Sequence, residues 1–248
     1  MERSKYYVVI ALLLFLMVQV QASNKEAIYQ SYLTNNMQGW KHTIDEMQKN
    51  KTNDAQYLLE LINYQYGYIA WCIGNEKMKE ARWYLDKAFD NLEAAEAFKN
   101  QESMVYAYKA AFWGFEIGLA KYKAPYYGLK SIEASKKALA LDSENWLAYV
   151  QSANIQYYMP PIFGGSKKEA LHQYKKAMEI MEKQKKEIIQ DWNYLNLLVI
   201  IAQGYTQESK IKEAIALYEI ILKIEPQFSW VKNQLYPDAL KLKISNNE

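Results

Sequence analysis

The sequence predicts an all-α fold built from antiparallel helical hairpins that stack on one another. From Asn24 onwards, apolar residues recur every three or four positions with hardly an alternating stretch, which is the period of a helix. Glycine and proline number only 9 and 5 in 248 residues, too few for many short strands joined by tight turns. Long helices with few breaks are therefore favoured.

The periodicity divides the chain into helical segments joined by short links. The expected helices cover residues 25–36, 38–50, 54–73, 77–98, 102–122, 129–141, 144–158, 167–187, 191–207, 210–224 and 229–243. Short links force neighbouring helices to lie antiparallel, so the structural unit is a hairpin. A hairpin cannot bury both of its faces alone, and successive hairpins are expected to stack.

The first 22 residues read as a secretory signal peptide. Arg3 and Lys5 give a positive start, residues 8–18 form an unbroken apolar run, and small residues precede Ser23. The run is shorter than the roughly 20 apolar residues that a membrane-spanning helix needs, although an uncleaved anchor is the alternative. We expect a mature chain that starts near Ser23, has no transmembrane segment and is exported, periplasmic or secreted.

Composition argues against several classes of function. The chain has 30 basic and 28 acidic residues, and Arg3 and Arg82 are its only arginines. Arginine supplies the planar fork that recognises phosphates and base edges, so nucleic acid is not an expected partner. Cys72 is the single cysteine, which excludes an intrachain disulfide and paired-cysteine metal sites, and its apolar surroundings predict a buried thiol.

Catalytic and metal-binding motifs are incomplete. Glu169 and His172 have the Glu-x-x-His spacing of di-iron bundles, but His42, the other histidine, has no glutamate three residues before it. The run that follows Gly164 lacks the full phosphate-loop pattern, and no G-x-S-x-G elbow occurs. Ser166 with Glu169 instead predicts a capping box at a helix start. We expect no enzyme activity, metal or cofactor.

A repeat is clearest over residues 195–228. It reads Leu198-x2-Ile201-Ala202-x2-Tyr205, then Ala214-x3-Tyr218, then Pro226. This resembles the tetratricopeptide repeat (TPR) pattern of about 34 residues, W-x2-L-G-x2-Y…A-x3-F…P, with the spacing kept. Ala202 and Ala214 are expected where the two helices cross most closely, and Pro226 ends the second helix.

The resemblance covers residues 54–228 and implies a right-handed TPR-like superhelix, or solenoid, of roughly five hairpins with a C-terminal capping helix. It predicts a single domain over 23–248, with an N-terminal hairpin at 24–52 and a capping helix and tail at 229–248.

The TPR resemblance also implies a binding surface, because the first helix of each hairpin lines a concave groove in that family. Matching the repeats assigns to this groove Tyr64, Tyr68, Trp71, Tyr108, Ala111, Phe115, Val150, Asn154, Tyr157, Asn196, Val199 and Gln203. The set is rich in aromatic rings and amides and almost free of charge. Val150 lies one turn before Asn154, where a carboxylate-gripping clamp would have a lysine. An apolar or extended peptide is therefore expected, although several of these rings can instead pack between repeats.

Two aromatic elbows depart from a plain repeat. Residues 122–128 and 158–164 share the pattern Tyr-x2-Pro-x-aromatic-Gly, 36 residues apart. In each, proline is expected to end the first helix of a hairpin and glycine to supply the turn. They are either packed corners or a contact ridge. The second elbow and its following helix resemble exported repeat proteins of the Bacteroidota and, faintly, the periplasmic T component of TRAP-type transporters.

These observations predict an exported scaffold or adaptor that binds a protein or peptide partner in its groove. A substrate-loading or assembly subunit of an envelope transport system is the first alternative, and an enzyme of unrecognised type is the second. The oligomeric state is left open.

Overall fold

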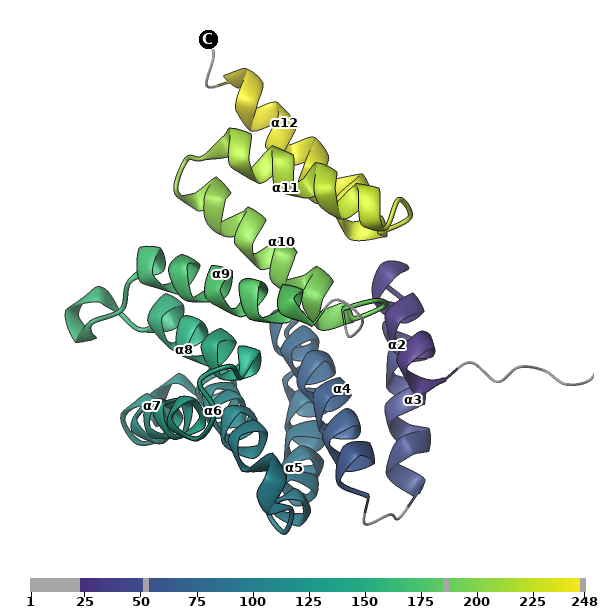
Figure 1. The fold of residues 1–248 in the computed structure, drawn as a ribbon, viewed down its shortest axis with the longest axis vertical. Helices are drawn as coiled ribbons and strands as arrows, with labels where there is room; N and C mark the ends of the chain where they lie inside the picture. The colour runs from purple at the N-terminus through teal and green to yellow at the C-terminus, as the bar shows by residue number, and fades with distance from the viewer. Residues whose placement is uncertain (1–22, 51–53, 185–187, 246–248) are drawn as a thin grey trace, which may run out of the picture.

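In the computed structural model, the described residues are 23–50, 54–184 and 188–245, and the predicted signal peptide lies outside them. They form eleven α-helices and no strand, which confirms the all-helical prediction (Figure 1). None of the helices in these three ranges is long and apolar enough to span a bilayer.

The helices follow one another as antiparallel pairs. Their bounds are α2 Asn24–Leu33, α3 Met37–Lys49, α4 Ala55–Gly74, α5 Met78–Ala95, α6 Glu102–Leu119, α7 Ala124–Leu141, α8 Trp146–Tyr158, α9 Lys167–Lys183, α10 Trp192–Gln207, α11 Ile211–Ile224 and α12 Tyr236–Ser245. Within each of the five pairs from α2–α3 to α10–α11 the two helices pack together, and α12 packs on α11. A π-helical turn, Val231–Leu235, leads into α12.

Side-chain caps fix several of the helix starts. The Ser166 hydroxyl accepts a hydrogen bond from the Glu169 backbone N–H at 3.2 Å, which is the predicted cap of α9. The Ser23 hydroxyl receives the Glu26 N–H at 3.2 Å in the same way at α2. These bonds satisfy backbone donors that the first helical turn leaves unpaired.

The two elbows differ in local structure. In the first elbow (residues 122–128), α6 ends at Leu119, α7 begins at Ala124 and Pro125 lies in its first turn. The expectation that proline ends a helix there is wrong. Backbone N–H groups in the first turn of a helix have no intrahelical acceptor, so the missing N–H of proline costs nothing there, and its fixed φ suits the helix. Pro125 therefore lies at the start of the second helix, and Gly128 lies inside that helix.

The second elbow (residues 158–164) follows the prediction. Met159 and Pro160 are extended, which ends α8, and a 3-10 turn over Pro161–Phe163 leads to Gly164. A Cβ on the following Gly165 would lie 1.8 Å from the Met159 carbonyl oxygen, so only glycine fits that position. This turn projects from the helical bundle in Figure 1.

The N-terminal hairpin closes onto the C-terminal half of the chain through aromatic rings. Trp192 at the start of α10 meets Trp40 of α3 edge to face, with ring centroids 5.0 Å apart. Tyr32 of α2 lies 6.0 Å from Trp192 and 5.0 Å from Phe228. A Cβ on Gly67 of α4 would approach ring atoms of Trp40 and Trp192 to 2.7 Å, so the rings pack directly on bare backbone. This aromatic cluster occupies the middle of the molecule.

The small residues of the best repeat are buried. Ala202 of α10 and Ala214 of α11 are fully buried. Tyr218 is buried beside them, and Tyr205 is half-buried. Interiors are packed to crystal density, so a larger side chain at either alanine would have to displace its neighbours.

Candidate binding pocket

Three of the aromatic residues assigned to the groove lie in the core. Tyr64, Tyr68 and Tyr108 expose only 3%, 1% and 2% of their surface. The Tyr64 hydroxyl donates to Glu60 at 2.6 Å and the Tyr68 hydroxyl to Glu80 at 3.0 Å, so both polar ends are satisfied internally. Ala111, Val150 and Val199 are buried as well. For these six residues the structure agrees with the alternative of packing between helices.

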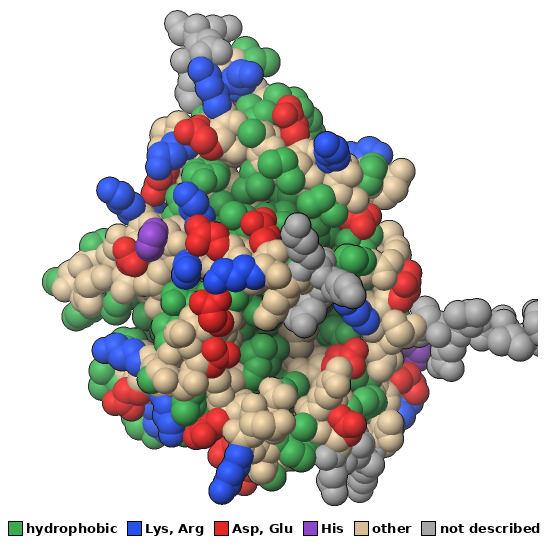
Figure 2. Space-filling view, viewed as in Figure 1, with side chains coloured by type: hydrophobic (Ala, Val, Ile, Leu, Met, Phe, Trp, Pro, Cys, Tyr) green, Lys and Arg blue, Asp and Glu red, His purple; other side chains and the backbone are tan. Residues whose placement is uncertain are grey.

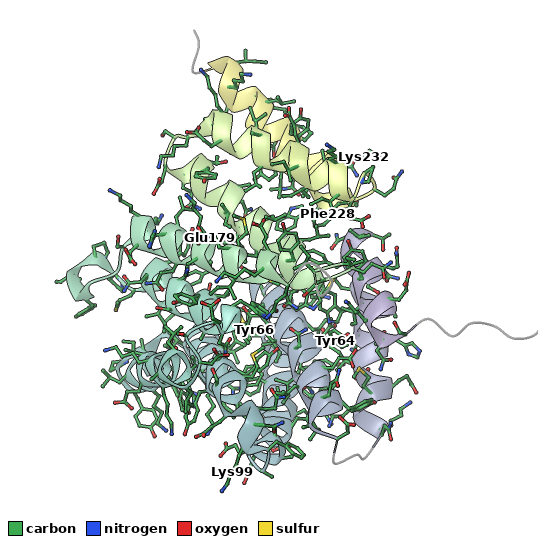
Figure 3. The ribbon with its side chains drawn as sticks, viewed as in Figure 1. Tyr64, Tyr66, Lys99, Glu179, Phe228 and Lys232 are labelled. Carbon is green, nitrogen blue, oxygen red and sulfur yellow. The ribbon has the colours of Figure 1, made fainter. Side chains whose placement is uncertain are left out.

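Three further groove residues are half-buried and already engaged. Phe115 stacks on Tyr66 with ring centroids 5.5 Å apart and an interplanar angle of 19°. The Lys77 ammonium lies 4.4 Å from the Trp71 ring centroid. The Asn196 side-chain oxygen accepts a hydrogen bond from the Tyr32 hydroxyl at 3.0 Å. Figure 3 labels Tyr66 near the middle of the molecule, and its ring also lies 6.1 Å from Tyr108 and 6.3 Å from Trp192.

The last three groove residues come together in a pocket between α8, α9 and α10. Asn154 and Tyr157 belong to α8, and Gln203 belongs to α10. The pocket has a volume of about 160 Å³. It is lined by Asn154, Tyr157, Tyr158, Lys167, Leu171, Tyr174, Ile200, Gln203, Gly204, Gln207 and Glu208. The spacing on α8 puts Asn154 and Tyr157 on one face of the helix.

The rim of the pocket joins two hairpins. The Tyr157 hydroxyl donates to the Gln207 side-chain oxygen at 3.0 Å, across from α8 to α10. The Lys167 ammonium lies 5.4 Å from the Tyr157 ring centroid, within the range of a cation–π contact. Tyr158 meets Tyr157 edge to face at 4.9 Å. The rim is therefore aromatic, with one cation beside it.

A row of hydrogen bonds leads from the pocket to the core. The Tyr174 hydroxyl donates to the Asn154 side-chain oxygen at 2.5 Å. The Asn154 amide donates to Gln151 at 3.1 Å, and the Gln151 amide donates to the Tyr66 hydroxyl at 3.3 Å. These bonds fix the orientation of the Asn154 amide, because its acceptor and one donor are both occupied.

The floor of the pocket is apolar, with one uncommitted amide beside it. Leu171 lies against Gly204, where an added Cβ would meet the leucine methyl group at 3.0 Å. Leu171 and Ile200 supply the apolar lining. Gln203 has no hydrogen-bond partner among the described residues, so its side chain is available to both a donor and an acceptor of a ligand.

The titratable groups that line the pocket are mostly tyrosines. Burial raises the pKa of Tyr174 well above its ordinary value. Glu208 is paired with Lys210 at 2.5 Å. Tyr174 therefore stays protonated at neutral pH and acts as a hydrogen-bond donor to Asn154.

Residues singled out for other chemistry lie elsewhere. Cys72 is fully buried, as predicted, and burial raises its pKa to about 11. His42 and His172 are exposed. In the described ranges, no group of three or more His, Cys, Asp and Glu side chains is arranged to hold a metal ion.

Repeat matching missed the part of the pocket that α9 contributes. It assigned the groove to the first helix of each hairpin, whereas Leu171 and Tyr174 come from a second helix. Gln207 was also missed, although it lies one turn after Gln203 on the same face of α10. A search for amides at this spacing would have found it.

Comparison with known proteins gives a fold but no family. No protein-family model matches the chain, and no curated protein matches its sequence. Among solved structures, the chain is similar to the HusA haemophore from Porphyromonas gingivalis, a member of the Bacteroidota, with a TM-score of 0.59 and 17% identity. The match covers 77% of this chain and 96% of HusA. At this identity the likeness shows a shared fold and nothing more.

Proposed function

We propose that this chain is an exported, non-catalytic binding protein that holds a peptide segment of a protein partner at the pocket between α8, α9 and α10. The observation that carries the proposal is the uncommitted Gln203 amide beside a tyrosine-lined rim. An amide offers both a donor and an acceptor, which is what an extended peptide backbone requires. The neighbouring rings offer stacking area at a low entropic cost.

The size of the pocket favours a single side chain over a whole small molecule. Pockets that enclose drug-sized ligands measure roughly 300–1,000 Å³. The volume of about 160 Å³ is below that range. One apolar or aromatic side chain of a peptide fits this space against Leu171 and Ile200, while the rest of the peptide lies along the rim.

We also propose that the five hairpins form a right-handed TPR-like superhelix. Support comes from the five successive hairpins and from the buried Ala202 and Ala214 at the matched repeat positions. Export is supported by the signal-like residues 1–22 and by the position of Ser23, which caps α2 directly after them. A partner in an envelope transport system, which the chain would load or assemble, is a more specific version of the same binding role.

The absence of catalysis is also part of the proposal. Among the pocket residues, Glu208 is the only carboxylate and pairs with Lys210. No pocket residue is a histidine, cysteine or serine, so the pocket lacks the usual nucleophile and base pairs. Stacking and amide hydrogen bonding are the chemistry that its lining supports.

A second candidate ligand is haem, favoured by the likeness to a haemophore. A planar macrocycle would stack on the exposed Tyr158, and Lys167 would pair with a carboxylate of haem. The pocket volume counts against this candidate, because the macrocycle would lie over the pocket and not inside it.

A peptide selection tests the proposal directly. A random peptide library displayed on phage is selected on the immobilised chain, and the affinity of a selected peptide is measured by calorimetry. We expect Gln203→Ala to weaken binding by about 1–2 kcal/mol, since a hydrogen bond to the peptide is lost. Gln30→Ala removes an exposed amide from α2 and serves as the matched control.

Two results would contradict the peptide proposal. One is a selection that enriches no peptide, and the other is a selected peptide whose affinity is equal for Gln203→Ala and Gln30→Ala. Titration with hemin, followed by absorbance, tests the second candidate. Saturable binding that is weakened by Tyr158→Ala would favour haem, and unchanged spectra would exclude it.

A further inference from the structure

Large apolar side chains gather at the tips of both elbows. In the first elbow and directly after it they are Tyr122, Tyr126 and Leu129, and in the second elbow they are Tyr158, Ile162 and Phe163. Their exposed fractions run from 60% at Tyr126 to 84% at Ile162. Single exposed apolar residues are ordinary, but a cluster at a projecting tip marks an interaction surface. Figure 2 shows hydrophobic side chains at the end of the projecting α8–α9 turn.

The second elbow holds its apolar side chains outward on an ordered turn. The Phe163 backbone N–H donates to the Pro160 carbonyl at 2.9 Å, and the Ser166 N–H donates to the Gln156 carbonyl at 2.9 Å. Gly165 permits a backbone approach that no other residue could make. The turn is therefore fixed by backbone bonds and close packing, while Ile162 and Phe163 project from it into solvent.

The two sequence stretches that contain the elbows carry lysines and no acidic residues. No Asp or Glu occurs from residue 117 to 132 or from 145 to 168, although acids are frequent elsewhere in the chain. The lysines in these two stretches are Lys121, Lys123, Lys130, Lys167 and Lys168. Lys123 pairs with Glu116 at 2.8 Å. The tips thus combine apolar rings and aliphatic groups with lysines that flank them.

The two elbows belong to neighbouring hairpins that pack on each other. α7 packs against both α6 and α8, and α6 also packs against α8. The first elbow therefore joins α6 to α7, and the second elbow joins α8 of the next hairpin to α9. Separate variants of each elbow test whether both tips contribute to one surface.

We propose that the two elbows form a docking edge for the surface of an anionic lipid bilayer. Tyrosine rings are suited to the headgroup level, where an apolar body and a polar tip are both accommodated, and the wholly apolar Phe163 can enter more deeply. Ile162 and Leu129 enter the boundary of the acyl chains, and the flanking lysines are attracted to anionic headgroups. The lipid bilayer is the occupant that matches both the apolar tips and their charge.

A second copy of the chain matches this edge less well. Elbow-to-elbow contact would bring the lysines of the two copies together, and like charges repel. The projecting second elbow is also convex, so it cannot enclose a partner's anchor residue as a protein-binding pocket does. Self-association is nevertheless a distinct outcome of the test.

Vesicle co-sedimentation tests the docking edge. The probes are phosphatidylcholine vesicles with and without phosphatidylglycerol. We expect the chain to bind the anionic vesicles, to bind them less at high salt, and to lose about tenfold in binding in the double variant Ile162→Asp, Phe163→Asp. Tyr122→Asp with Leu129→Asp tests the first elbow in the same way. Ile220→Asp, on an exposed position of α11, is the matched control and should leave binding unchanged.

The proposal is overturned if the wild-type chain does not bind anionic vesicles, or if the control variant loses as much binding as the elbow variants. Light scattering tests the remaining possibility, which is self-association of the chain through the elbows. An oligomer that the same elbow variants dissociate, without any vesicle binding, would show that the edge binds a second copy. Circular dichroism confirms that each variant is folded. Gln203→Ala should leave vesicle binding unchanged, so the pocket and the docking edge are tested independently.

Discussion

Trp192 and Trp40 meet edge to face, with ring centroids 5.0 Å apart and an interplanar angle of 76°. One ring comes from the first hairpin and the other from the start of α10. Tyr32 and Tyr66 contact the same tryptophan, Trp192, from α2 and α4. The first hairpin therefore docks on a helix far along the chain, and aromatic rings make the contact.

This contact leads to a prediction about stability. Trp192 is buried, and its truncation to alanine should cost about 3–5 kcal/mol because a cavity is left between three helices. Trp83, which is 51% exposed on α5, gives the matched control. Trp83→Ala should change the free energy of unfolding by less than about 1 kcal/mol. Urea denaturation measures both, and equal losses would mean that the rings do not hold the two halves together.

The second prediction concerns the register of the best repeat. Ala202 is fully buried at the predicted crossing of α10 and α11. Ala202→Leu should overpack this contact and cost roughly 1–3 kcal/mol. Ala216 is exposed on α11, so Ala216→Leu adds the same atoms without a neighbour to displace. A denaturation midpoint unchanged by Ala202→Leu would refute the predicted crossing.

The sequence predicted the helices well because their signals are local. Eleven helices were expected and eleven are present among the described residues. The cap at Ser166 followed from a three-residue pattern. Pro125 was misassigned because proline suits the first turn of a helix as well as the end of one, and a sequence pattern alone does not separate the two.

The candidate site was harder to predict because burial depends on distant contacts. Helical spacing shows that Tyr64, Tyr68 and Trp71 share a face, but it cannot show what covers that face. Tyr84 of α5 covers Tyr68 with ring centroids 4.9 Å apart, whereas Trp192 contacts Tyr66 on another face of α4. Asn154, Tyr157 and Gln203 stay accessible because they lie further along the array, beyond the reach of the first hairpin.

The third prediction is a dependence of stability on pH. Glu116 is buried and accepts a hydrogen bond from the Arg82 Nη2 at 2.9 Å and another from Lys123 at 2.8 Å. The Arg82 hydrogen bonds are the main cause that lowers the pKa of Glu116, and Lys123 adds to them. The carboxylate therefore stabilises the fold above its unfolded pKa of about 4.3, and this stability is lost as the pH falls through the lower folded value.

Glu116→Gln should lower the free energy of unfolding at pH 7 by about 1–3 kcal/mol, because charged hydrogen bonds are lost inside the protein. The difference from wild type should shrink below about pH 4, where the wild-type carboxylate also becomes protonated. Glu133→Gln, at an exposed position on α7, should show no such difference at either pH. If the difference in free energy of unfolding between wild type and Glu116→Gln stays constant down to pH 2, the assigned role of the ion pair is contradicted.

The last prediction separates binding from folding among the aromatic residues assigned to the groove. Tyr157 lies on the rim of the pocket, whereas Phe115 is stacked on Tyr66 beside the core. Tyr157→Ala should weaken the binding of a selected peptide by about 2 kcal/mol if the ring is an anchor, and it should change the thermal unfolding temperature little. Phe115→Ala should instead cost about 3 kcal/mol of stability and leave the affinity of the folded protein unchanged.

Both variants need calorimetric binding and thermal unfolding measured side by side. Peptide affinity should depend little on ionic strength, because rings and amides hold the peptide and few ion pairs exist to be screened. Vesicle binding at the elbows should show the opposite dependence, since lysines contribute to it. If peptide affinity falls only in the variants that also unfold early, the rings belong to the core, and the pocket between α8, α9 and α10 is not the binding site.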